Sequence, residues 1–216
     1  DANQPFYDSS GRYVIVFNGE IFNYEHLKKT KLNSKAIQFK THADTEVLLQ
    51  LLINYGPACL EWLSGFFAFA FYDRNQQEMI IARDRFGKKP LVLAEQNDSL
   101  LFASELKAIM PLLPEKKIDA ESVHLFFQFN YLPPEQSILQ NVRKLKPGTY
   151  IHIRENQLSE HQYYTLRIER ERYSEYNYGE ACNRLVTLMD EAVQQRMISD
   201  VPLGSFLSGG IDSSVV

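Results

Sequence analysis

The side chains best suited to chemistry near the end of this chain lie in one short stretch, residues 208–214, in the order Ser-Gly-Gly-Ile-Asp-Ser-Ser. An apolar run precedes it, so we expect a strand, a loop and the start of a helix. Two adjacent glycines let successive backbone N–H groups converge on an anion that the positive helix end also faces. A Walker A loop would carry a lysine, which this stretch lacks. The pattern predicts either a phosphate loop of another design or an ordinary strand-to-helix turn.

Asp212 is the carboxylate of this stretch. It cannot face a phosphate directly without repulsion, and a magnesium ion between the two groups would remove that conflict. We therefore expect Asp212 to contact a metal ion. Its alternative role is to cap the helix that follows.

A second chemical group follows the apolar run 13–17. We expect that strand to end at Asn18 and Gly19, so that Asn18, Gly19 and Glu20 present a carboxamide, an open backbone N–H and a carboxylate within one turn. Such groups could stabilise an oxyanion and bind an ammonium group. An Asn-Gly pair after a strand is also a common turn, because both residues tolerate positive φ. The residues alone leave both interpretations open.

Asp44 opens a helical pattern whose apolar positions 47, 48, 51 and 52 share one stripe. Its carboxylate could simply cap this helix. It could also serve as a recognition group, since a capped helix start would hold it rigidly.

The elements that must position these residues follow from periodicity and turn residues. The expected strands are 13–17, 66–73, 78–83, 90–94, 100–103 and a hairpin of 149–153 with 162–166 across Glu155 and Asn156. The expected helices start at Asn23, Asp44, Glu105, Asp119 and Glu180, the last reaching about Ile198 with an apolar stripe assigned to core packing. The four short strands from 66 to 103 indicate an antiparallel sheet. The charged, tyrosine-rich stretch 167–179 lacks steady periodicity and is expected to be a linker.

Composition excludes several classes of function. The chain has 216 residues, 44% hydrophobic and 23% charged, with a net charge of −4 that argues against a general nucleic-acid surface. Its longest apolar run is far below the roughly 20 residues of a membrane helix. Cys59 and Cys182 have no paired spacing, which fits a reducing compartment and hence the cytoplasm. No pair of histidines has the spacing of a metal site.

Several stretches together resemble one enzyme family. VPLGSFLSGGIDSS resembles the pyrophosphate loop of ATP pyrophosphatases, most closely that of glutamine-dependent asparagine synthetases. VIVFNGEIFNY resembles the strand and loop of class II glutamine amidotransferases, and THADTE is similar to their TxSDTE segment with Ala43 in place of Ser. ARDRFGKKPL and FASELKA also match, so the resemblance follows nearly the whole chain in family order. We expect Asp84 and Gly87 of the former to make a turn, and Arg83, Arg85 and Lys88 to be solvated charges.

The resemblance implies a fold and a division of the chain. Residues 1–166 would form a four-layer α/β/β/α N-terminal-nucleophile hydrolase sandwich, an α+β fold without its first segment. Residues 180–216 would begin an α/β ATP-pyrophosphatase domain, after the linker 167–179. The resemblance also implies that Asn18 and Gly19 stabilise the tetrahedral oxyanion, Glu20 helps seat glutamine, and Asp44 binds its α-amino group.

The implied reaction is that of an asparagine synthetase. Ammonia released from glutamine would attack a β-aspartyl adenylate, giving asparagine, glutamate, AMP and pyrophosphate. The implied small-molecule partners are glutamine, aspartate and ATP with Mg²⁺, with no nucleic acid and no membrane; a homodimer is left open. The residues implied to bind ATP are Leu207, Ser208, Gly209, Gly210, Asp212, Ser213 and Ser214.

Three alternatives stay open. A related amidotransferase could act on a sugar acid or another carboxylate, a β-lactam-forming relative could carry an inactive glutaminase half, and a non-catalytic module could use the same fold. The retained Asn18, Gly19, Glu20 and Asp44 favour a working glutaminase. The chain begins at Asp1, downstream of the family's Cys nucleophile and its substrate-binding arginine, so we expect an excerpt that neither hydrolyses glutamine nor binds ATP measurably by itself.

Overall fold

The computed structural model describes residues 3–33, 37–96, 99–168, 177–197, 202 and 204–215. The chain divides into two compact units, Asp1–Thr165 and Leu166–Val216. Among the described residues, the first unit contains two antiparallel sheets with helices, and the second contains the helices at 178–195 and 211–215. No helix of the described ranges is long and apolar enough to cross a membrane.

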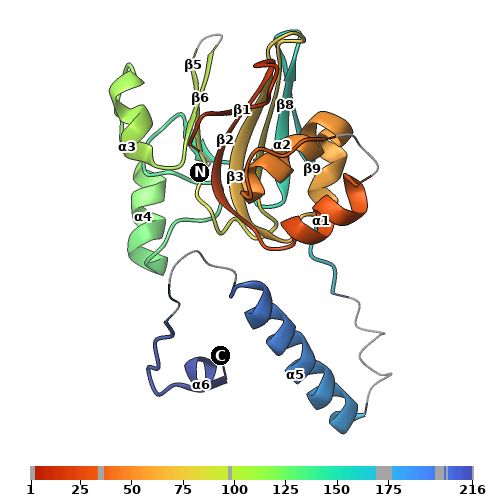
Figure 1. The fold of residues 1–216 in the computed structure, drawn as a ribbon. Helices are drawn as coiled ribbons and strands as arrows, with labels where there is room; N and C mark the ends of the chain where they lie inside the picture. The colour runs from red at the N-terminus through yellow and green to blue at the C-terminus, as the bar shows by residue number, and fades with distance from the viewer. Residues whose placement is uncertain are drawn as a thin grey trace. The chain divides into compact units, whose positions relative to one another are not determined.

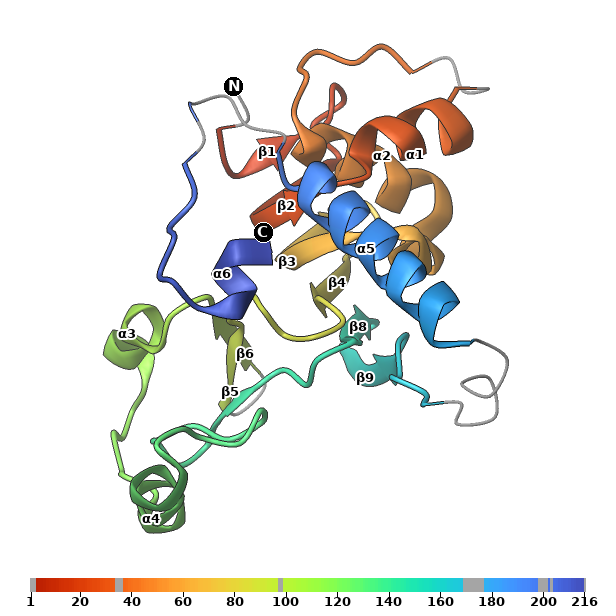
Figure 2. The same ribbon diagram turned by 90° about the horizontal axis from the view of Figure 1, so that it is seen from below.

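The first unit has a larger and a smaller sheet. The larger sheet has the strand order β1 (Phe6–Tyr7), β2 (Tyr13–Ile21), β3 (Gly65–Asp73), β4 (Glu78–Arg83), β8 (Thr149–Arg154) and β9 (Gln157–Gln162). These strands follow one another across the view of Figure 2. The smaller sheet has the order β6 (Ser99–Ala103), β5 (Val92–Gln96) and β7 (Val142–Lys144).

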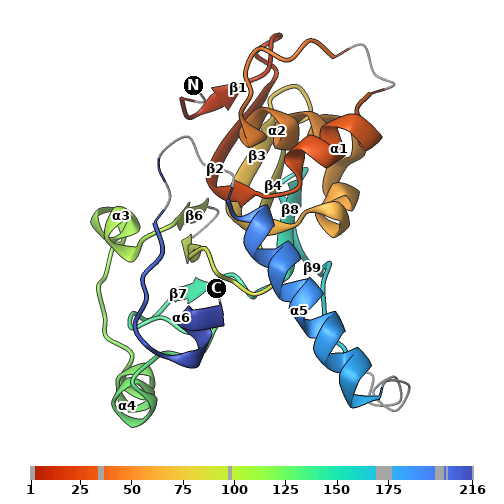
Figure 3. The same ribbon diagram turned by 60° about the horizontal axis from the view of Figure 1, so that its bottom comes forward.

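Helices cover the outer face of each sheet. The larger sheet carries α1 (Tyr24–Lys31), α2 (Asp44–Tyr55) and the 3-10 helix η1 (Gly56–Trp62), and α2 lies against β2 (Figure 3). The smaller sheet carries α3 (Leu106–Ile109), the 3-10 helix η2 (Met110–Leu112) and α4 (Ala120–Phe129). Figure 1 shows the resulting order of helices, sheet, sheet and helices.

Three clusters of buried side chains lie at the three interfaces of these four layers. The cluster under α2 contains Ile15, Phe69 and Leu48. The cluster between the sheets contains Ala68, Ala70, Ile81, Leu93 and Ile151. The cluster under α3 contains Val92, Ala94 and Ile109. Each interface therefore has an apolar core of its own, which holds the four layers together.

The strand β2 is longer than the sequence pattern indicated. It continues through Asn18, Gly19 and Glu20 to Ile21, and every residue from Tyr13 to Ile21 pairs with β3. The expected strand end at Asn18 and the alternative of a turn there are therefore wrong. The pairing with β3 overrides the turn preference of Asn and Gly, because tertiary context decides β structure more than local propensity does.

The last hairpin of the larger sheet has a different register from the expected one. Its returning strand is β9, with Arg154 opposite Gln157, rather than residues 162–166. Glu155 and Asn156 both have positive φ, 53° and 59°. That geometry is typical of a two-residue hairpin turn, which forces the return strand to start at once.

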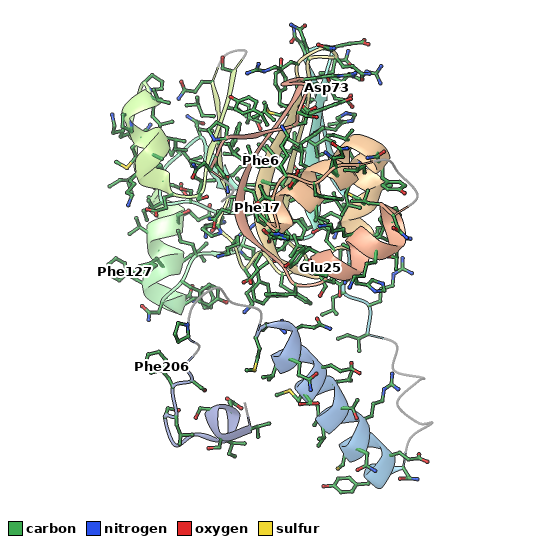
Figure 4. All side chains as sticks on the ribbon, viewed as in Figure 1. Phe6, Phe17, Glu25, Asp73, Phe127 and Phe206 are labelled. Carbon is green, nitrogen blue, oxygen red and sulfur yellow. The ribbon has the colours of Figure 1, made fainter. Side chains whose placement is uncertain are left out.

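The starts of the helices show which polar side chains cap them. Asp119 precedes α4 and accepts a hydrogen bond from the Ser122 N–H at 3.0 Å, as expected. Asn23 precedes α1, but its side chain binds Trp62 O and the Ser64 N–H instead. The far face of α4 is open, and Phe127 projects outward from it with 81% exposure (Figure 4).

The second unit contains α5 (Tyr178–Gln195) and α6 (Ile211–Val215). Asn177 and Glu180 form a capping box at the start of α5, which begins at Tyr178 rather than at the expected Glu180. No residue of α5 is buried, and Leu185 and Leu188 are 61% and 51% exposed, so the stripe assigned to core packing is not buried in this unit. Residues 204–208 form no strand, and Leu203 and Ile198 lie outside the described residues.

Candidate active site

The free edge of β2 is the feature that organises the candidate site. The N–H and C=O of Phe17 bond to the Gln4 side chain at 2.5 and 2.6 Å, and the N–H of Ile21 donates to Asp44 Oδ2 at 2.8 Å. In a strand, alternate residues direct their backbone groups to the same edge. Gly19 lies between Phe17 and Ile21, so its N–H points to this edge and not to β3.

Gly19 is required by a close approach of β3. A Cβ atom at this position would lie 2.2 Å from Phe66 O and 2.7 Å from Phe67 Cα. Gly65 faces the same constraint from the other strand, because its Cβ would lie 2.1 Å from Glu20 O. Two glycines thus allow β2 and β3 to come unusually close where the Gly19 N–H is presented.

The Asn18 side chain lies on the face of β2 that is turned toward the smaller sheet. Its Nδ2 donates to Ser104 Oγ at 3.0 Å, directly after β6. Both side chains border a pocket of about 240 Å³ lined by Gln4, Val16, Phe17, Asn18, Ala68, Phe69, Ala70, Leu91, Phe102, Ala103 and Ser104. Val16 is 38% exposed here, so this face of β2 is not fully covered. Glu20 follows on the same face and is exposed.

Asp44 is the first residue of α2, and its carboxylate bonds both to β2 and, at 3.4 Å, to the hydroxyl of the neighbouring Thr45. Ala43 occupies the cap position, and no side chain caps this helix. The proposed capping role of Asp44 is therefore wrong, because its carboxylate accepts the Ile21 N–H instead. Burial raises the pKa of the Asp44 carboxyl above its ordinary value, and the hydrogen bond from Ile21 opposes part of that rise.

Glu46 is a second carboxylate in this region and was missed from the sequence. It is 4% exposed and accepts hydrogen bonds from the Lys40 N–H, the Thr41 N–H and the Thr41 hydroxyl at 2.7 to 3.1 Å. Thr41 Oγ1 accepts in turn from the Ala43 N–H at 3.2 Å. Glu46 therefore fixes the loop that leads into Asp44. The sequence signal that could have pointed to Glu46 was its position two residues after Asp44, in the same segment.

The loop after β4 is structural, although two of its charges are buried. Asp84 is 1% exposed, and its carboxylate accepts the N–H groups of Phe67, Phe86, Lys88 and Lys89 at 2.9 to 3.2 Å. Arg83 is 6% exposed and donates to three backbone carbonyl groups, so its assignment as a solvated charge is wrong. A guanidinium group has donors enough to join several chain segments at once.

The described part of the serine-glycine loop is held by bonds of its own. Ser208 and Ser213 share a hydrogen bond of 2.9 Å between their hydroxyl groups, and Ser213 and Ser214 donate to Gly210 O at 3.1 and 2.8 Å. Gly209 has φ of 80°. Since α6 begins at Ile211, Asp212 is its second residue and does not occupy the cap position. Leu207 is 74% exposed. Within the described ranges, no group of three or more His, Cys, Asp or Glu side chains could hold a metal ion.

Cys59 is not among the residues that line the pocket beside Asn18. Cys59 is buried under α2, and burial raises the pKa of its thiol to about 12. Cys182 is exposed on α5. Cys59 therefore offers no thiolate to the site at Asn18.

Comparison with known proteins places the chain in a family. Residues 1–164 match the family model described as glutamine amidotransferase domain. The chain belongs to this family. Residues 184–216, beyond the amidotransferase domain, match the model described as asparagine synthase.

Two curated relatives resemble the whole chain. Asparagine synthetase [glutamine-hydrolyzing] 1 of Bacillus subtilis (strain 168) is 35% identical over 217 residues, which cover 100% of this chain and 34% of that protein. Asparagine synthetase [glutamine-hydrolyzing] 3 of the same organism is 33% identical over 207 residues, 94% of this chain and 33% of that protein. The chain thus spans about a third of the length of these relatives.

A solved structure resembles the amidotransferase domain in fold. It is the glutamine phosphoribosylpyrophosphate amidotransferase from B. subtilis complexed with ADP and GMP. Its TM-score is 0.52 at 22% identity, over 76% of this chain and 32% of that chain. Together with the four layers, this likeness confirms the expected α/β/β/α fold.

Proposed function

We propose that the first unit binds glutamine and releases its amide nitrogen as ammonia, within a longer glutamine-hydrolysing asparagine synthetase. The observation that carries this proposal is the shared edge of β2, where the Gly19 N–H and the Asp44 carboxylate both lie. Residues 19 and 21 are about 7 Å apart along a strand. A glutamine along this edge would place its carboxamide oxygen at Gly19 and its ammonium group at Asp44.

The chemistry of these groups matches the two ends of glutamine. A carboxylate recognises an ammonium group through a charge-assisted hydrogen bond. At the other end, attack on the carboxamide carbon moves the carbonyl electron pair onto oxygen. The Asn18 Nδ2 and the Gly19 N–H would donate to that oxyanion, and Glu20, on the same strand, would help seat the substrate.

The nucleophile would be the amino-terminal cysteine of the whole protein, as the family resemblance implies. Its thiolate would form a bond to the carboxamide carbon, the α-amino group of the same cysteine would pass a proton to the amide nitrogen, and collapse of the oxyanion would break the C–N bond and release ammonia. Water would then hydrolyse the thioester to glutamate. The two free cysteines within this chain support a reducing compartment such as the cytoplasm.

The loop 208–214 would serve the second half of the reaction, with ATP and Mg²⁺. The match of residues 184–216 to the asparagine synthase model and the names of the relatives support this part. Gly209, Gly210 and the serine hydroxyls offer neutral donors for pyrophosphate, and Asp212 offers a hard oxygen ligand. A single carboxylate fits magnesium, which usually takes one or two carboxylates together with phosphate oxygens. Aspartate would be the acceptor of the ammonia.

The test is a product analysis of the full-length protein with glutamine, ATP, Mg²⁺ and aspartate. Asparagine, glutamate, AMP and pyrophosphate should form in equal amounts. Transfer of nitrogen to a sugar acid or another carboxylate in place of aspartate would favour a related amidotransferase. Failure to release glutamate with any acceptor would contradict the proposal and favour a non-catalytic module.

A further inference from the structure

Asn18 and Ser104 come from different sheets and meet in the pocket beside β2. They are 86 positions apart in the chain, and Asn18 Nδ2 lies 3.0 Å from Ser104 Oγ. We propose that Ser104 is a positioning residue for glutamine hydrolysis, which holds the Asn18 carboxamide so that its second N–H is aimed at the oxyanion. This inference rests on the proposed function.

The carboxamide of asparagine needs such a partner. The torsion that rotates it is broad and roughly two-fold, so the backbone alone does not select one orientation. The amide nitrogen carries two N–H donors. When one donates to Ser104, the rotation is restricted and the second remains for a substrate oxygen. Preorganised donors of this kind stabilise a developing charge without reorganisation during the reaction.

One end of the contact lies in a paired strand, and the other directly follows one. Asn18 lies opposite Ala68 in the pairing of β2 with β3. Ser104 directly follows Ala103, which lies opposite Val92 in the pairing of β6 with β5. The hydrogen bond can therefore form only at the observed distance between the two sheets. The packing of those sheets thus fixes the orientation of the Asn18 amide.

Ser104 is the polar side chain of this pocket that is available to bond to the Asn18 carboxamide. Among the described residues that line it, Gln4, Asn18 and Ser104 carry polar side chains. Both ends of the Gln4 amide already bond to the Phe17 backbone, at 2.5 and 2.6 Å. Gln4 thus secures the main chain of β2 next to the site, which leaves Ser104 to hold the Asn18 side chain.

The test compares Ser104→Ala, Ser104→Thr and Asn18→Ala in the full-length protein. We expect Ser104→Ala to lower kcat for glutamine hydrolysis about 5-fold, the size of one neutral hydrogen bond. KM for glutamine and the ammonia-dependent synthesis should not change, because the contact acts on the transition state of one half-reaction. Ser104→Thr keeps the hydroxyl group and should restore most of kcat.

A double variant distinguishes positioning from a general structural role. In the Asn18→Ala background, Ser104→Ala should have no further effect, since the group that it positions is gone. An equal loss in both backgrounds, or an unchanged kcat for Ser104→Ala alone, would overturn the inference and leave the proposed function standing. An Asn18→Ala protein with full glutaminase activity would overturn the oxyanion role of Asn18 and this inference with it, whereas failure of the unchanged protein to release glutamate would overturn the proposed function.

Discussion

The two candidate sites of this chain are held in opposite ways. Asn18 bonds to a residue 86 positions away, and Asp44 bonds to Ile21, 23 positions away. Within the described residues, the hydrogen bonds of the serine-glycine loop join residues at most five positions apart, among exposed side chains. The first geometry depends on how sheets and helices pack, whereas the second is encoded within seven residues. Changes at the two sites should therefore affect different measurements.

The largest effect is expected at the oxyanion donor of the first site. Asn18→Ala should lower kcat for glutamine hydrolysis about 100- to 1000-fold, because one donor to the oxyanion is lost. The ammonia-dependent reaction of the full-length protein should stay unchanged and serves as the control. Equal losses of both activities would contradict the assignment of Asn18.

The next largest effect is expected on stability, at the close approach of β2 and β3. Gly19→Ala places a Cβ 2.2 Å from Phe66 O, so β3 must move. Overpacking of this kind costs about 3 kcal/mol. Gly11→Ala is the control for this substitution. Gly11, like Gly19, has a positive φ (69° against 158°), but a Cβ at Gly11 would meet nothing within 4 Å. In urea unfolding, Gly19→Ala should have a much lower free energy of unfolding than Gly11→Ala. Similar losses of unfolding free energy in the two variants would refute the close-approach explanation.

The metal hypothesis for the second site is tested by Asp212→Asn. Loss of a charged oxygen ligand should lower ATP–pyrophosphate exchange about 10- to 100-fold, if the interaction is worth about 1.5 to 3 kcal/mol. Glutamine hydrolysis should persist, because it belongs to the other unit. Asp190→Asn removes another exposed carboxylate of the second unit and should leave the exchange unchanged. Normal exchange in Asp212→Asn at ordinary magnesium concentration would exclude the metal contact.

A smaller effect is expected for Asp44→Asn, which keeps an oxygen for the Ile21 N–H but removes the charge. KM for glutamine should rise about tenfold through loss of a charge-assisted hydrogen bond. Asp119→Asn is the control, because that residue caps α4 and Asn caps equally well. An unchanged KM for Asp44→Asn would show that Asp44 only joins α2 to β2.

The pKa of Asp44 gives the same variant a pH signature. Burial raises this pKa above the ordinary 3.8. The protonated carboxyl therefore contributes stability that is full below the unfolded pKa and is lost as pH rises through the folded pKa. At neutral pH the partly buried Asp44 carboxyl is ionised, and this charge lowers the stability of the folded state. Asp44→Asn removes the charge and should therefore raise Tm slightly. In the wild type, kcat/KM should fall as pH drops through the raised pKa, and this decline should be absent in Asp44→Asn.

The sequence predicted the fold well where the signal was local or came from the family resemblance. The strands β3 and β4, the cap at Asp119 and the four layers follow from apolar runs, a cap residue and matched segments. The register of the last hairpin was predicted wrongly, with the return strand at 162–166, although the sequence carries a local signal for the correct register. Both residues of its Glu155-Asn156 turn adopt positive φ, and a two-residue turn requires Gln157 to pair with Arg154.

The remaining features depend on contacts between distant segments. Asn18 and Gly19 have the composition of a turn, and only pairing with β3 keeps them in a strand. By sequence Asp44 was a candidate helix cap, but it is the first residue of α2, and its carboxylate accepts the N–H of the distant Ile21. The bond from Asn18 to Ser104 requires two sheets to pack first. Such contacts have no local signal, because neighbouring residues do not encode the partner.

The buried carboxylate of Asp84 has a consequence for hydrogen exchange. The sequence of residues 84–89 is typical of a surface loop, and Phe86 in this segment is 58% exposed. Yet the amide protons of Phe86, Lys88 and Lys89 all bond to a carboxylate that water scarcely reaches. Their exchange with deuterium requires the carboxylate to be uncovered first, so they should exchange at the slow rate of the β3–β4 core rather than at that of a surface loop.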